Sequence, residues 1–286
     1  MNILQRILMT ISCHDCDGIA KVPDAGKIYD GDTGPLQIMH NGLKVRAGGY
    51  HGDWMAHIIR ALRGHHEPQE EFVFHELLRY ARHNSQFVEL GSFWSYYTMW
   101  YLNEIPGSQA LCIEPDAHSL EIGRFNCDVN GLASRVRFLS AWVGEYELDE
   151  MTQIRESDNR AVTLPCMNIG SVLKAVEGRA IEILHMDVQG AELPFLKSIK
   201  DAETRQQLRF IVLSSHHSSI SGCGSTHADC LSQLRNFGAH ILAEHDVQES
   251  FSGDGLIVAS FLDEDAVIEL PPISRNRASL SLFPEP

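Results

Sequence analysis

The chain has 286 residues, a formal net charge of −15 at pH 7, and 44% hydrophobic residues. This length suffices for one large α/β domain with additions, which buries most of its apolar surface without disulfide bonds. The acidic balance argues against nucleic-acid binding, which needs a basic face, and disfavours an anionic membrane surface.

The first residues predict an ordinary helix rather than a targeting segment. Residues 1–9 carry one basic residue in a short apolar period, and no small-residue cleavage site follows. No apolar run approaches the ~18 residues that a membrane span needs. The seven cysteines, an odd number, are typical of reduced thiols, and 13–16 lacks nearby partners for a structural zinc. We therefore expect a cytoplasmic protein.

Residues 1–84 are interpreted as an N-terminal extension. They are rich in His, Gly and Asp and show weak periodicity. The pair Asn41 and Gly42 predicts a hairpin between strands at 36–39 and 43–45. Helices are predicted at 54–62 and 70–82 from the spacing of apolar residues.

Residues 85–270 predict the main domain, in which apolar runs alternate with helical stretches. Continuous apolar strands separated by helices form parallel sheets that are covered on both faces. The expected fold is therefore α/β, with a doubly wound, mostly parallel sheet and one antiparallel strand near its end. The tail, 271–286, is predicted to be extended or loose. Strands are predicted at 86–90, 109–113, 135–140, 181–187, 209–214, 239–244 and 255–261, and helices near 94–103, 116–130, 168–176, 191–200 and 226–237.

Two acidic residues mark the ends of the first two predicted strands of this domain. Glu89 is followed by Gly91 and Ser92, and the second strand ends in Glu114 and Pro115. The glycine lets a ligand approach the backbone, and the second acid can accept hydrogen bonds from both hydroxyls of a ribose. The spacing of the two acids is close to that of one βαβ unit and predicts a pocket for a nucleoside.

The glycine pattern separates two kinds of nucleoside ligand. A dinucleotide site uses G-x-G-x-x-G, whose backbone amides wrap a pyrophosphate. Here Phe93 and Tyr96 stand at the later positions, where they would crowd a pyrophosphate. Glu89 would also repel it, whereas S-adenosylmethionine carries a sulfonium and an ammonium and no phosphate. The segment favours S-adenosylmethionine, and an unrelated parallel α/β domain is the alternative.

A third motif follows the fourth predicted strand. It reads Met-Asp-Val-Gln-Gly-Ala-Glu over 186–192 and places an acid, a turn glycine and a helix at the strand end. Together with the motifs at 88–91, 113–115 and 126–131, it resembles the FkbM family of S-adenosylmethionine-dependent methyltransferases. The resemblance covers roughly 86–260, and the Asp-x-x-Gly-Ala-Glu block is its specific part.

The resemblance implies a Rossmann-like class I methyltransferase that transfers methyl groups mostly to hydroxyl oxygens of sugars, polyketides and related metabolites. Two residues depart from the family pattern: Gln189 stands where Glu is more usual, and Ser95 stands where glycine is frequent. The strand ends and the resemblance together give a predicted cofactor site, in which the adenine lies against the backbone near Ser140 and Ala141, at the end of the third strand. The predicted residues are Glu89, Gly91, Ser92, Glu114, Pro115, Ser140, Ala141 and Asp187.

A catalytic base is predicted at the end of the fifth strand. Methylation of an alcohol needs alignment of the reactants and removal of the acceptor's proton. His216 and His217 follow an apolar strand beside Asp187, and a neutral histidine with a pKa of ~6.5 suits that step. Because side chains alternate along a strand, one of the two is expected to point into the site. We predict that His216 is the base; a surface or core histidine is the alternative.

A metal ion is the competing account of the same residues. Asp187 with His216 or His217, joined by Glu192 or Asp254, would hold a divalent ion that acidifies the acceptor hydroxyl. We do not favour this reading, because no ligand pair is spaced i, i+4.

Acceptor contacts are predicted on two sides of the cofactor. The N-terminal extension is expected to close over the acceptor as a lid, and 162–164 is expected to form a second wall. For 64–71 the alternative is a charged helix N-terminus. The predicted contacts are His40, His51, Glu67, Gln189 and Glu192.

The sequence therefore predicts an S-adenosylmethionine-dependent O-methyltransferase that acts on a hydroxyl of a small metabolite, sugar or natural product. Neither nucleic acid nor membrane is an expected partner, and a homo-oligomer is one assembly that the sequence allows. The alternatives are an N-methyltransferase that acts on an amine or amide, and a non-catalytic nucleoside-binding module.

Overall fold

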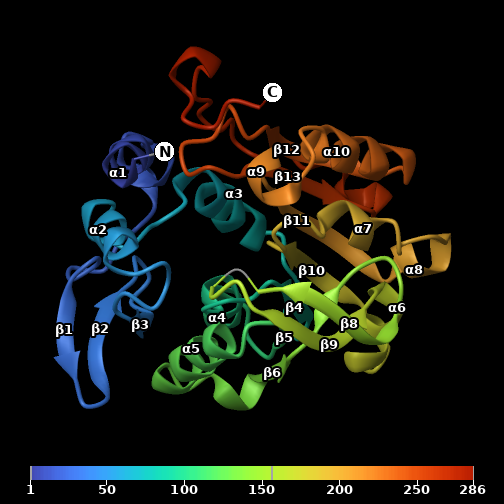
Figure 1. Ribbon diagram of the computed structural model, residues 1–286, viewed down its shortest axis with the longest axis horizontal. Helices are drawn as coiled ribbons and strands as arrows, with labels where there is room; N and C mark the ends of the chain where they lie inside the picture. Colours follow the sequence, from blue (N-terminus) through green and yellow to red (C-terminus); the bar gives the residue numbers. More distant parts are fainter. Residues whose placement is uncertain (1, 156, 286) are drawn as a thin grey trace.

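In the computed structural model, which describes residues 2–155 and 157–285, a seven-stranded sheet runs through the molecule (Figure 1). Its strands are β4 (Gln86–Leu90), β5 (Gln109–Ile113), β6 (Val136–Leu139), β10 (Ile181–Met186), β11 (Leu208–Ser215), β12 (His240–His245) and β13 (Gly255–Ser260). They lie in the order β12–β13–β11–β10–β4–β5–β6. Neighbours from β11 to β6 are parallel, and β13 is antiparallel to β11 and β12. The predicted α/β fold with a mostly parallel sheet is confirmed.

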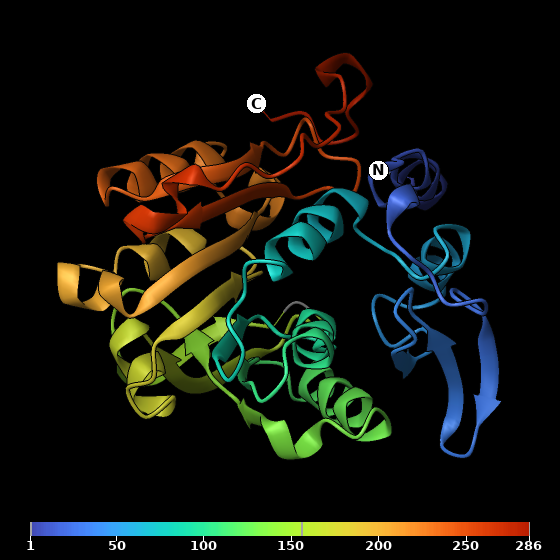
Figure 2. The ribbon, with the colours of Figure 1, turned by 180° about the vertical axis from the view of Figure 1, so that it is seen from behind.

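The sheet is buried on both faces because its strands are continuous apolar runs. Phe87 faces one hydrophobic cluster and its neighbour Val88 faces the other, as the alternation of side chains along a strand requires. On the Phe87 side lie α3 (Pro68–Leu78), α4 (Tyr96–Glu104) and α5 (Ala117–Val129), and Figure 2 shows α3 against this face. On the Val88 side lie α6 (Ile169–Ala175), α7 (Glu192–Leu196) and α10 (Thr226–Asn236).

The N-terminal segment forms a separate small layer beside the sheet (Figure 1). It contains α1 (Ile3–Ile11), β1 (Ile28–Gly31), β2 (Gly34–Ile38), β3 (Lys44–Arg46) and α2 (Asp53–Ala61). The predicted hairpin is confirmed: β2 pairs with β3 in antiparallel register, Gln37 opposite Val45. Strand β1, which pairs with β2, was not predicted, because its burial is low and its sequence shows no apolar alternation.

A second small sheet was also missed by the sequence analysis. It consists of β7 (Trp142–Val143), β8 (Leu148–Ile154) and β9 (Ala161–Met167), in the order β7–β9–β8. Only 162–164 had been singled out, as an acceptor wall. Strand β8 is mostly polar and exposed, so it lacks the apolar period from which strands are predicted.

Two helices differ from their predicted bounds for local reasons. Helix α4 begins later than the predicted 94 because Ser95 has a left-handed backbone (φ 59) that a helix cannot include. The helix predicted at 191–200 ends at Leu196, where the Ser198 hydroxyl donates to the carbonyl of Phe195 at 2.7 Å. The short helices α8 (Ala202–Gln206) and α9 (Ser218–Ser221) follow it in the chain.

The C-terminal tail is extended, as predicted, but it is docked rather than loose. Gln69 of α3 donates to the carbonyl of Ser274 at 2.8 Å, and Asn276 donates to that of Ser250 at 3.2 Å. Phe283 is buried. Across the described ranges, no helix is both long enough and apolar enough to cross a membrane.

Candidate active site

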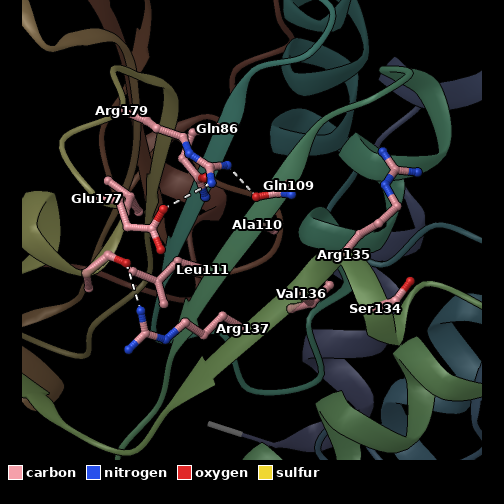
Figure 3. Close-up of a pocket in the computed structure, with 12 residues that line it drawn as sticks. Gln86, Gln109, Ala110, Leu111, Ser134, Arg135, Val136, Arg137, Glu177 and Arg179 are labelled. Carbon is pink, nitrogen blue, oxygen red and sulfur yellow. Dashed lines mark hydrogen bonds and ion pairs between the residues drawn. The ribbon is translucent and has the colours of Figure 1, made fainter.

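Two cavities lie at opposite ends of the parallel strands of the seven-stranded sheet. We call the side where these strands begin the amino edge and the side where they end the carboxyl edge. The smaller, of about 170 Å³, lies at the amino ends of β4, β5 and β6. Figure 3 shows two of its arginines hydrogen-bonded within the protein: Arg179 donates to Gln109, and Arg137 donates to the backbone carbonyl of Ala175 at 2.9 Å. The larger, of about 850 Å³, lies at the carboxyl ends of the strands. Ligands of open α/β sheets bind beyond the carboxyl ends, so the larger cavity is the candidate active site.

Gly91 and Glu114 line this cavity at the ends of β4 and β5. Gly91 has φ +73, and a Cβ there would stand 1.6 Å from the backbone oxygen of Asp187, so only glycine fits. The Glu114 carboxylate accepts the backbone N–H of Phe93 at 3.0 Å and that of Asp116 at 2.8 Å. These bonds fix its orientation and leave each oxygen a second lone pair for a ligand. Burial raises the pKa of Glu114 to about 7, although both bonds oppose the shift.

Asp187 lies in the cavity wall directly after β10, and it is paired with His216, the residue that follows β11. His216 Nε2 is 3.0 Å from Asp187 Oδ1, and His216 Nδ1 is 2.6 Å from Glu192 Oε1. A third carboxylate, that of Asp254, lies 3.8 Å from His216 Nε2. The histidine is 1% exposed, so it sits behind Asp187 rather than in the cavity.

The charges of this cluster favour an imidazolium between carboxylates. Burial lowers the pKa of His216, but the charges of Glu192 and Asp254 and the hydrogen bonds to Asp187 and Glu192 raise it well above 6.5. Burial raises the pKa of Asp187, but the bond to His216 outweighs it and leaves that pKa below 3.8. Burial raises the pKa of Asp254 to about 7, against the charge of His216. Asp187 is therefore ionised at neutral pH, which suits a cationic sulfonium nearby.

Three further wall residues have left-handed backbones: His51 (φ 49), Phe93 (φ 36) and Gln189 (φ 52). Such conformations are costly for residues other than glycine and gather at functional sites. Gln189 donates to Asp187 Oδ1 at 3.3 Å. Tyr50 also lines the cavity, and its ring stacks on Trp94 with centroids 4.6 Å apart.

The third wall comes from the small sheet that the sequence did not reveal. Trp142, Tyr146, Met151 and Arg155 line the cavity there. Arg155 lies 3.8 Å from Asp116, which ties the β8–β9 hairpin to the Glu114 side of the cavity. In 161–167 alternate residues are less exposed, and that period was the available signal for β9.

Of the predicted cofactor residues, the structure brings together Gly91, Glu114, Pro115, Ala141 and Asp187 in the cavity wall. Glu89 lies behind the cavity wall, where it is buried and accepts the Thr98 backbone N–H at 3.2 Å. Burial raises its pKa to about 7, against the charge of His185 and the bonds from Thr98. Ser92 is buried, and Ser140 is exposed in the loop before β7; within the described ranges, neither lines the cavity.

Of the predicted acceptor and catalytic residues, His51 and Gln189 line the cavity. Glu67 is one layer behind, where it accepts the Tyr50 hydroxyl at 3.4 Å. Glu192 is fully buried behind His216. His217 points away, with Nε2 3.1 Å from the carbonyl oxygen of Pro284 in the docked tail.

His40 lies in the N-terminal layer, in a buried cluster with His65 and Glu71 whose ligand-type atoms are all within 4.8 Å of one another. Glu71 is 2.6 Å from His65 Nδ1, and His40 Nδ1 is 2.9 Å from the Tyr96 hydroxyl. These are hydrogen-bond distances, so Nδ1 of each histidine is paired, whereas His65 Nε2 is buried without a partner among the described residues. The cluster holds the loop before α3 in place through hydrogen bonds to Glu71, and it does not line the larger cavity.

The model of the Methyltransferase FkbM domain matches residues 47–241. Solved structures similar to this chain include the methyltransferase FkbM from Methylobacillus flagellatus (14% identity, TM-score 0.46, covering 73% of this chain and 61% of that one). Another is TrmK from M. capricolum with S-adenosyl-homocysteine (11% identity, TM-score 0.43, 68% and 74%). A third is precorrin-6y C5,15-methyltransferase from Geobacter metallireducens (12% identity, TM-score 0.42, 66% and 86%).

Among curated proteins, none matches the chain. The family model covers more than half of the 286 residues and includes the motifs that line the cavity. This chain therefore belongs to the FkbM family and is an S-adenosylmethionine-dependent methyltransferase.

Proposed function

We propose that the protein methylates a hydroxyl group of a small acceptor molecule in the cavity at the carboxyl ends of the strands. The observation that carries the proposal is the cavity of about 850 Å³ between Glu114 and Asp187, with Gly91 at its floor. Cavities of roughly 300–1,000 Å³ enclose drug-sized ligands, so this one has room for the cofactor and part of an acceptor. The formal charge of −15 supports a small acceptor over nucleic acid.

The residues present fit S-adenosylmethionine. Glu114 would hold the ribose hydroxyls with its fixed carboxylate. Gly91 would let the methionine part approach the backbone, and Ala141 and Trp142 would flank the adenine. The ionised Asp187 favours the positive charges of the cofactor. When bound, the cofactor supplies an activated methyl group on a cationic sulfur.

Oxygen is favoured over nitrogen as the methyl acceptor because the cavity wall contains ionisable side chains such as Asp187. A hydroxyl must lose its proton as it is methylated, so it needs a proton acceptor nearby, whereas a neutral amine attacks with a free lone pair. Asp187, held by His216 at 3.0 Å, accepts a hydrogen bond from the hydroxyl and orients it. His216 is thus a positioning residue for Asp187.

Calorimetric titration with S-adenosylmethionine and S-adenosylhomocysteine tests the cofactor site, with Glu121→Ala, an exposed residue of α5, as the matched control for Glu114→Ala. A mass-spectrometric screen for methyl transfer then compares hydroxylated acceptors with amines and amides. Transfer to amines alone would make the protein an N-methyltransferase. Tight cofactor binding with no transfer to either class would identify a binding module.

A further inference from the structure

The acceptor's proton needs a destination that faces the cavity, and His216 does not provide one. Both of its ring nitrogens lie against carboxylates: Nδ1 is hydrogen-bonded to Glu192 at 2.6 Å, and Nε2 forms an ion pair with Asp187 at 3.0 Å. The side chain is also enclosed, at 1% exposure. An imidazolium held in this way has no lone pair for a second proton.

His51 has the properties that His216 lacks. It lies between β3 and α2 and lines the cavity together with Gly91 and Asp187. Its ring is held among aromatic neighbours, with centroid distances of 4.4 Å to Tyr50 and 5.3 Å to Phe93. Across residues 2–155 and 157–285, no hydrogen bond or ion pair engages its imidazole. Both nitrogens are therefore available to a ligand.

The backbone at His51 supports a role in the site rather than in packing. Its φ of 49 is left-handed and is followed by Gly52 with φ 81. A residue other than glycine in this conformation costs free energy, and such residues gather at functional sites. The residue is also exposed at the cavity mouth, so burial of apolar surface does not account for its presence.

We propose that His51 is the general base for methyl transfer to the acceptor hydroxyl. The proposal rests on the proposed O-methyltransferase function. As the acceptor oxygen bonds to the methyl carbon, the carbon–sulfur bond breaks and its electron pair stays on sulfur, which becomes a neutral thioether. The hydroxyl proton passes to the free imidazole nitrogen of His51, which becomes an imidazolium and returns the proton to solvent at the cavity mouth.

Charged groups on three sides set the protonation of His51. Although part of the side chain reaches solvent, the surrounding rings desolvate the imidazole and lower the pKa of His51 below 6.5, and the charges of Arg6 from α1 and His66 act in the same direction. Asp187 and Glu67 oppose them. The net shift leaves His51 neutral at pH 7, the form that accepts a proton.

His51→Asn tests the proposal, because asparagine tolerates the left-handed backbone but cannot act as a base. With a hydroxylated acceptor from the screen, we expect kcat to fall ~10²- to 10⁴-fold and the affinity for S-adenosylhomocysteine to stay within twofold. The parent's kcat should rise with pH through one ionisation below about 6.5, and this inflection should vanish in the variant. His57→Asn, on an exposed position of α2, is the control. A variant kcat within threefold of the parent, or a retained inflection, would overturn the proposal.

A readout without an acceptor separates this proposal from the function on which it rests. At pH 7, diethyl pyrocarbonate should modify neutral, accessible His51 at a rate comparable to exposed His57 and leave buried His216 unmodified, as followed by peptide mass spectrometry. Nuclear magnetic resonance titration of the S-adenosylhomocysteine complex should give His51 a pKa below 6.5. An unreactive His51, or one that stays protonated above pH 7.5, would refute the base assignment even where cofactor binding holds. Failure of the cofactor to bind would instead refute the proposed function.

Discussion

The two edges of one sheet use their polar side chains in opposite ways. At the amino edge, Arg135 donates to the backbone carbonyls of Ser108, Leu102 and Ile105 at 2.9–3.2 Å. Its guanidinium is therefore paired with groups of the protein itself. At the carboxyl edge, Glu114 and Asp187 keep oxygens directed at an open cavity. Charged groups at the amino edge are satisfied by the protein, whereas those at the carboxyl edge are held in place for a ligand.

The difference shows in the pKa values as well as in the contacts. Glu114 and Asp254 at the carboxyl edge each have a pKa raised to about 7 by burial. Burying a carboxyl costs stability, and such costs are tolerated where they serve binding or catalysis. Substitutions at the carboxyl edge should therefore impair cofactor binding, and substitutions at the amino edge should reduce stability alone.

The largest effect is expected for Gly91→Ala. The new Cβ would stand 1.6 Å from the backbone oxygen of Asp187, so the ends of β4 and β10 must separate. We expect the affinity for S-adenosylhomocysteine to fall more than ~100-fold, about 3 kcal/mol, in calorimetry. Gly107→Ala is the matched control at the amino edge: its φ is +72, and its Cβ would meet the Asn84 side chain at 2.1 Å. That variant should lose about 1–2 kcal/mol of stability and bind normally. Equal binding losses in both would erase the contrast between the edges.

Glu114→Ala is the second test. Removing a charged acceptor from two ribose hydroxyls should weaken binding of S-adenosylmethionine by about 1.5–3 kcal/mol. The control, Glu121→Ala, should leave binding unchanged because this side chain is exposed on α5. An affinity within twofold of the parent for Glu114→Ala would show that another group holds the ribose.

A smaller effect is expected from pH. Burial raises the pKa of Glu114 from 4.5 to about 7, so ribose hydroxyls meet an ionised acceptor only above that value. The affinity for S-adenosylhomocysteine should rise up to ~10-fold between pH 6 and 8, a range that spans one full titration. The raised pKa of Glu114 also stabilises the unliganded fold. This stabilisation is fully present below pH 4.5 and is lost as the pH rises through 7. In Glu114→Gln, both dependences should flatten; an unchanged slope would assign them to another group.

The sequence predicted the parts of this site that local patterns specify. Strand ends marked by Gly91, Glu114 and Asp187 converge because parallel strands end at the same edge. The sequence analysis grouped His216 with Glu192 and Asp254 only as a metal site that it did not favour, and it took His216 as a neutral base. The charged state of His216 was not predictable, since only tertiary packing sets the distances of 2.6 and 3.8 Å to these carboxylates. The wall formed by β8 was missed because the strand is mostly polar and exposed and therefore shows no apolar period.

The smallest effect is expected for Arg137→Ala, and it tests the comparison most directly. Arg137 lines the smaller cavity and donates one hydrogen bond, to the carbonyl of Ala175 at 2.9 Å near the end of α6 (Figure 3). Because its side chain is exposed, we expect thermal unfolding to show a loss of only about 0.5–1 kcal/mol. Cofactor affinity should not change, since β4 and β5 separate this cavity from Glu114 by their whole length. A twofold or greater change in affinity for S-adenosylhomocysteine would mean that the amino edge communicates with the cofactor site, and its arginines would then belong to the functional machinery rather than to the scaffold.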